Sequence, residues 1–108
     1  EMIKVEIKRQ AGKIHSFLVS GHAETAKHGE DLVCAAVSGI VQTALLGLST
    51  HLERELTLVH RHGEAGATLK DIPDQRTEDI LGTMVLGLTA IQKEYPKTIQ
   101  LQETPANK

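Results

Sequence analysis

The strongest constraint on the fold is the order in which two kinds of apolar periodicity follow one another along the chain. Apolar residues at every second position predict β-strands. They occur in five short stretches, Ile3–Arg9, Ile14–Ser20, Leu56–His60, Ala65–Leu69 and Thr98–Glu103. The first two stretches predict a hairpin around residues 11–13, and the next two a hairpin around Gly63. Within the second strand, simple alternation puts Ile14 on the face opposite Phe17 and Val19.

Two longer stretches carry helical periodicity instead. Asp31 suits the N-cap of the first helix because its carboxylate can accept a backbone N–H of the first turn. The apolar stripe that follows is Val33, Val37, Ile40, Val41, Ala44 and Leu48, and this helix is expected to end near His51. The second helix begins at Pro73-Asp74 and closes at Tyr95-Pro96. Its stripe is Ile80, Leu81, Met84, Val85, Leu88 and Ile91.

The resulting order of elements is ββαββαβ. It predicts an α+β fold, an α/β sandwich in which a single mixed or antiparallel sheet is covered by two helices. A chain of 108 residues suits one domain with one core. We therefore expect a single domain over residues 1–108, with residues 103–108 as a polar tail.

Composition excludes several classes of function. The net charge is −2, with a pI near 6.3, and Phe17 and Tyr95 are the only aromatic residues. Direct nucleic-acid binding is therefore not expected, because it uses a basic face or a stacking platform. No apolar run is expected to approach the roughly 18–20 residues that a membrane helix needs, so no membrane span is expected. Cys34 is the single cysteine, which excludes an intramolecular disulfide and favours the cytoplasm.

The reactive side chains concentrate between Gly21 and Cys34. With Asp31 as N-cap, Cys34 is the third helical residue, where the free N–H groups and the helix dipole stabilise a thiolate. Its angular position is the rim of the apolar stripe, neither deep core nor open solvent. A thiolate is the nucleophilic form of cysteine, and backbone N–H groups nearby can hold an oxyanion. These features favour nucleophilic catalysis.

A histidine is available as the base, and other interpretations stay open. The glycine-bracketed loop 21–29 carries His22, with His28 as the competing candidate. Cys34 is also compatible with a small buried residue that has no chemical role. A zinc site formed by His22, His28 and Cys34 is less favoured, because three ligands at this spacing match no usual zinc motif.

The same residues carry a resemblance to a known family. Ser20-Gly21-His22-Ala23, followed by Gly29-Glu30-Asp31-Leu32-Val33-Cys34-Ala35-Ala36-Val37-Ser38, closely resembles the signature of the bacterial ribosomal-processing cysteine proteases, the Prp family. The resemblance extends in outline over almost the whole chain. By this resemblance Cys34 is the nucleophile and His22 the general base and acid. Asp31 and Ser38 would support the site, and Gly21 and Gly29 would be hinges of a mobile loop.

The resemblance also implies a substrate and an assembly. Family members remove the N-terminal extension of bacterial large-subunit ribosomal protein twenty-seven, and this removal supports ribosome assembly. By the same resemblance the protein is expected to be a homodimer. No cofactor or metal is implied. Two rival interpretations are a non-enzymatic ribosome-associated module that binds a protein partner, and a structural dimer whose cysteine is inert.

Overall fold

A computed structural model describes residues 2–21 and 28–105 of the chain. Its elements are β1 (Ile3–Gln10), β2 (Lys13–Ser20), α1 (His28–Leu46), the π-helical η1 (Gly47–His51), β3 (Leu56–Arg61), β4 (Glu64–Leu69), α2 (Gln75–Glu94) and β5 (Ile99–Pro105). The predicted ββαββαβ order is confirmed. The first helix ends at His51 once η1 is included, as the sequence predicted.

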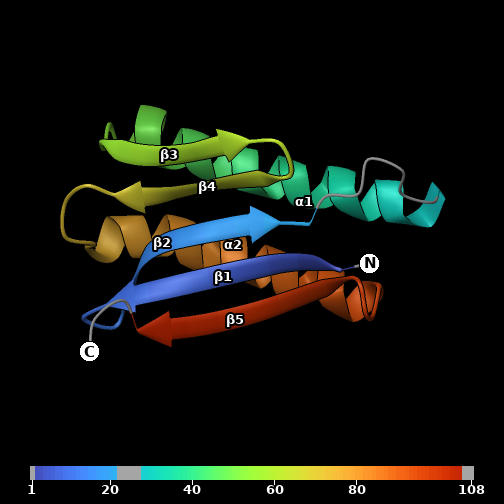
Figure 1. Ribbon diagram of the computed structural model, residues 1–108. Helices are drawn as coiled ribbons and strands as arrows, with labels where there is room; N and C mark the ends of the chain where they lie inside the picture. Colours follow the sequence, from blue (N-terminus) through green and yellow to red (C-terminus); the bar gives the residue numbers. More distant parts are fainter. Residues whose placement is uncertain (1, 22–27, 106–108) are drawn as a thin grey trace.

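The five strands form a single mixed sheet in the order β3-β4-β2-β1-β5. The hairpin partners are antiparallel, β2 also pairs antiparallel with β4, and β1 pairs with β5 in parallel. Figure 1 shows α1 and α2 side by side on one face of this sheet, while no helix of the described residues covers the other face, called the bare face below. The fold class predicted from the sequence, one sheet covered by two helices, is therefore confirmed.

The hydrophobic core lies between the sheet and the helices. The largest fully buried side chains come from both layers and are Val5, Ile7, Ile14, Val19, Val37, Leu48, Thr77, Leu81 and Leu88. The strands bury alternate residues, and the helices bury a stripe at three- and four-residue spacing, because each element turns one side toward the other layer. This core fixes which face of each element remains available for a site.

Strand β2 contains a β-bulge that the alternation did not reveal. The register with β1 shifts at Lys8 and Arg9, where Ser16 and Ile14 are the successive partners, so His15 is left without a partner. One extra residue reverses which face the following side chains occupy. Ile14 is therefore buried in the core together with Phe17 and Val19, and the prediction that placed Ile14 on the opposite face was wrong.

Two predicted element ends were also wrong. Helix α1 begins at His28 rather than after Asp31, so Gly29 and Asp31 both lie in its first turn and Asp31 is not the N-cap. Carboxylates are favourable anywhere in a first turn, so Asp31 did not determine the starting residue. Strand β5 extends to Pro105 because Lys8 and Arg9 of β1 still offer partners there, so the predicted polar tail begins too early.

Among residues 2–21 and 28–105, one stretch is long and apolar enough, by length and composition alone, to cross a membrane. Leu32–His51 has 20 residues and a mean hydropathy of 1.9. The prediction that no apolar run reaches this length was wrong, because Gly, Ser and Thr interrupt the run without lowering its mean hydropathy enough. Its buried residues, Val33, Val37, Val41, Ala44 and Leu48, belong to the core shared with the sheet. This packing is that of a helix covering a sheet.

Helix α2 begins with a reciprocal capping arrangement. The Asp74 carboxylate accepts the backbone N–H of Thr77 at 3.1 Å, while the Asp74 N–H donates to the Thr77 hydroxyl at 3.0 Å. Arg54 forms an ion pair with Asp74 at 2.9 Å. The pKa of Asp74 is lowered, mainly by the hydrogen bond from the Thr77 N–H and next by the hydrogen bond from Arg54, because both interactions favour the ionised carboxylate.

The lowered pKa of Asp74 predicts how its contribution to stability depends on pH. A carboxylate with a depressed folded-state pKa stabilises the fold above its unfolded pKa, about 3.9, and loses that contribution as the pH falls through the folded value. Asp74→Ala is therefore expected to melt a few degrees below the unmodified protein at pH 7. The difference should disappear in strong acid. Thermal denaturation from pH 7 to pH 2 checks this, with the exposed Asp71→Ala as control, and an unchanged melting temperature at pH 7 would contradict it.

Candidate active site

Cys34 lies on α1 at the rim of the core. Its side chain is partly buried and packs against the hydrophobic cluster, as the helical spacing predicted. Because α1 begins at His28, Cys34 is the seventh residue of the helix rather than the third. Its own N–H is therefore within the helical hydrogen-bond ladder, and the free N–H groups belong to the first turn. A thiol at this rim is reachable from one side of the helix.

That side faces away from α2. Ser38 follows Cys34 by one turn and Gln42 by two, so the three side chains share one stripe of α1. Ser38 and Gln42 are exposed, and they line a small cleft whose other walls include Val19 of β2 and Ala65 of β4. The Cys34 stripe thus borders the β4 side of the sheet.

Strand β2 ends at a backbone geometry that only glycine fits. Gly21 has φ +92°, and a Cβ at this residue would lie 2.6 Å from the carbonyl oxygen of Met2. The Gly21 N–H donates to the carbonyl oxygen of Gly63, in the β3–β4 turn, at 3.2 Å. Met2, just before β1, and the β3–β4 turn therefore fix the direction in which the chain leaves β2, one residue before His22.

The structure describes some of the predicted site residues fully, some by their backbone alone, and one not at all. Cys34, Ser38 and Gly21 are placed as above. His22 lies outside the described residues, so its relation to Cys34 stays a prediction. His28, Gly29 and Asp31 are placed by their backbone in the first turn of α1, at the same helix end as Cys34.

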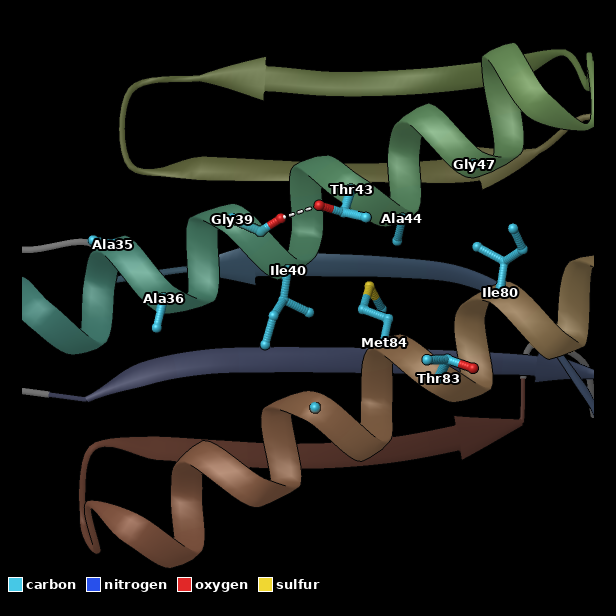
Figure 2. A pocket seen from close by; sticks show the side chains of 11 residues that line it. Ala35, Ala36, Gly39, Ile40, Thr43, Ala44, Gly47, Ile80, Thr83 and Met84 are labelled. Carbon is cyan, nitrogen blue, oxygen red and sulfur yellow. Dashed lines mark hydrogen bonds between the residues drawn. The ribbon is translucent and has the colours of Figure 1, made fainter.

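A second hollow lies on the outer side of the two helices. It is a groove of about 670 Å³ between α1 and α2, lined by Ala35, Ala36, Gly39, Ile40, Thr43, Ala44, Gly47, Ile80, Thr83, Met84 and Gly87. Figure 2 shows Ala36 and Ile40 of α1 pointing toward α2, and Met84 of α2 pointing toward α1. The residues that line the groove carry no charge. The groove is separate from the Cys34 stripe, which occupies another side of α1.

The β3–β4 turn was not predicted to lie near the site. Gly63 was recognised as a turn residue, but its hydrogen bond to Gly21 depends on β4 pairing with β2. Such pairing between distant strands leaves no signal in local periodicity. Only the sheet order brings the turn beside the end of β2.

Comparison with known proteins shows which family has a similar sequence. The family model described as "Cysteine protease Prp" matches residues 2–100. A curated relative, the ribosomal processing cysteine protease Prp of Mycoplasma pneumoniae, is 46% identical over 105 residues, covering 94% of this chain and 95% of the relative. The protein of the same description from Bacillus subtilis is 30% identical over 107 residues, covering 93% and 96%.

A solved structure shares the fold. The crystal structure of the ribosomal processing protease Prp from Staphylococcus aureus, in complex with a covalently linked product peptide, superposes with a TM-score of 0.84 at 25% identity. The match covers 95% of this chain and 100% of that one. The similarity therefore spans both layers of the fold and the helix that carries the cysteine.

Proposed function

Since this chain belongs to the Prp family of cysteine proteases, we propose that it is an endopeptidase in which Cys34 is the nucleophile and His22 the general base. The observation that carries the assignment is the position of Cys34, the single cysteine, partly exposed on α1 within the family-matched region. A cysteine kept only for packing would have no need of access to solvent.

The proposed reaction is covalent hydrolysis of a peptide bond. His22 removes the proton from the Cys34 thiol, and the sulfur attacks the scissile carbonyl carbon to give a tetrahedral oxyanion. The free N–H groups in the first turn of α1 are the donors proposed to hold that oxyanion. His22 then protonates the leaving amine, and water hydrolyses the thioester to release the acid and the free thiol.

The remaining signature residues are assigned supporting roles. Gly21 would fix the base of the loop, because its N–H donates to Gly63 and the Met2 carbonyl leaves no room for a side chain there. Ser38, exposed one turn after Cys34, would orient the thiol or the substrate. Asp31 would add negative charge in the first turn of α1, which stabilises the helix. A hinge at Gly29 would have to unwind that first turn, since Gly29 is helical.

The proposed substrate is the N-terminal extension of large-subunit ribosomal protein twenty-seven. It is supported by the family resemblance and by relatives described as ribosomal processing proteases. We place the reaction in the cytoplasm, where that precursor is synthesised and where a lone thiol such as Cys34 stays reduced.

Incubation of the purified protein with the precursor, read by intact-mass spectrometry, tests this function. The expected result is loss of the N-terminal segment at one position and release of the matching peptide. Binding of an uncleaved precursor would instead indicate the non-enzymatic ribosome-associated module, and an intact precursor that does not bind would reject both.

We further propose that the chain forms a homodimer through the groove between α1 and α2. No Asp, Glu, Lys or Arg occurs from Leu32 to Leu52, so α1 from Leu32 onward and η1 carry no carboxylate, ammonium or guanidinium group. Leu32 and Leu46, at seven-residue spacing on either side of Gly39, are 57% and 61% exposed. Large exposed apolar patches mark interaction surfaces, and small residues such as Gly39 let a partner helix approach closely.

A charge placed in the groove should therefore separate the dimer. Thr43→Glu is expected to elute as a monomer in size-exclusion chromatography with light scattering, because burying an unpaired carboxylate in an apolar interface is strongly unfavourable. Gln102→Glu, exposed on the bare face of the sheet, should remain dimeric. An unmodified protein that is monomeric at micromolar concentration would reject the interface.

A further inference from the structure

The edge strand β3 turns apolar surface toward the helix layer without being covered by it. Leu58 pairs with Ala67 and His60 with Ala65, and directly paired residues share a face of the sheet. Ala65 also pairs with Val19, which is buried beneath α1. Leu58 and His60 therefore project on the helix side, yet Leu58 is 61% exposed and His60 is exposed.

This uncovered face of β3 is continuous with the side of α1 that carries the nucleophile. Between them lies β4, whose helix-side residues there are the small Ala65 and Ala67. Ala65 lines the cleft that Ser38 and Gln42 border on α1. We call the set Ser38, Gln42, Leu58, His60 and Ala65 the α1–β3 surface. It presents two exposed polar side chains on one wall and an exposed leucine on the other.

The direction of β3 connects this surface to the catalytic end of the molecule. The strand runs from Leu56 to Arg61 and ends at the turn whose Gly63 carbonyl binds the Gly21 N–H. Gly21 immediately precedes His22. The α1–β3 surface therefore leads from the far end of β3 toward the place where the loop leaves β2, and Cys34 lies on its α1 wall.

From this continuity we propose that the peptide substrate binds in extended form along the α1–β3 surface, with an apolar side chain against Leu58 and its scissile bond at Cys34. This inference rests on the proposed protease function. The hydroxyl of Ser38 and the amide of Gln42 supply hydrogen-bonding groups for the substrate backbone, and the small Ala65 leaves room for its chain. Gln42 and Leu58 are then specificity-determining residues.

A charge at Leu58 should weaken substrate binding without altering the chemistry. Leu58→Asp is expected to raise KM for the precursor by about tenfold or more, as loss of a central apolar contact does, and to change kcat by less than about twofold. Thr57→Asp changes the neighbouring residue on the opposite face of the same edge strand and should leave KM unchanged. Equal effects of the two variants, or an effect on neither, would overturn the proposal.

Disulfide trapping separates this inference from the protease function. In a Cys34→Ala background, Leu58→Cys and Thr57→Cys each give a chain with one thiol. The probes are peptides spanning the cleavage region of the ribosomal protein twenty-seven precursor, each with one cysteine activated as a thionitrobenzoate mixed disulfide. Trapping by Cys at 58 and not at 57 supports the surface even if the unmodified protein cleaves nothing. Cleavage together with equal trapping at both positions rejects the surface and retains the protease.

Discussion

Cys34→Ala is expected to abolish cleavage of the precursor, lowering kcat/KM by about 10⁴-fold or more, because the covalent route disappears with the sulfur. His22→Ala should have an effect of the same order, since the thiol then lacks its base. Cys34 is partly exposed at the rim of the core. Cys34→Ala is therefore expected to melt within a few degrees of the unmodified protein, and we expect the same of His22→Ala.

Two control variants make this prediction specific. His28→Ala should retain activity, because His28 is the histidine that competes with His22 for the role of base. Ser49→Ala, in η1 at the far end of the first helix, should cleave at the normal rate. Cleavage by Cys34→Ala at the unmodified rate would exclude covalent catalysis by this chain. Activity lost with His28 and retained without His22 would instead reverse the assignment of the base.

Gly66→Ala is expected to have the largest effect on stability. A Cβ at Gly66 would lie 2.2 Å from the carbonyl oxygen of Phe17 and 3.0 Å from the Cα of Leu18. Both are backbone atoms of the neighbouring strand β2, so the clash cannot be relieved by rotating a side chain. We expect a loss of about 3 kcal/mol in the free energy of unfolding, as overpacking at a rigid position gives, and a melting temperature lower by more than about 10 °C.

The matched substitution in a helix should have the opposite sign. Gly82 lies within α2, and the nearest atom to its added Cβ is a carboxylate oxygen of Glu78 at 3.9 Å, an ordinary contact. Gly82→Ala should stabilise the protein by about 0.5–1 kcal/mol, because alanine is the better helix former. Differential scanning calorimetry of both variants checks the pair. A Gly66→Ala protein as stable as the unmodified one would show that β2 and β4 can separate without cost.

The sequence predicted the local elements well because their periodicity is strong. Each strand and helix was placed within a few residues, and the stripe containing Val37 and Leu48 is buried as expected. The errors occurred where one residue changes the result. The bulge at His15 reverses a face without changing composition, and the start of α1 depends on a turn in which acidic residues are favourable at several positions.

The sequence predicted which residues form the candidate site, but it predicted their arrangement in space only in part. The exposure of Cys34 followed from its angle on the helix. The contacts that surround the site come from segments far apart in the chain: Met2 beside Gly21, Gly63 beside Gly21, and β3 beyond β4. These depend on strand order, which periodicity does not encode. The exposure of Leu58 could not be predicted either, because in the sequence Leu58 is one more apolar residue of an alternating strand.

The parallel pairing of β1 with β5 has a consequence for how the protein is made. Each hairpin pairs strands that are neighbours along the chain. The second edge of β1, in contrast, finds its hydrogen-bonding partner only in β5, where Ile3 pairs with Ile99. During translation the first strand therefore stays open on one side until β5 has emerged from the ribosome. The native sheet is completed only once β5 has been made, so a ribosome stalled before β5 should hold an inactive nascent chain that chaperones can still bind.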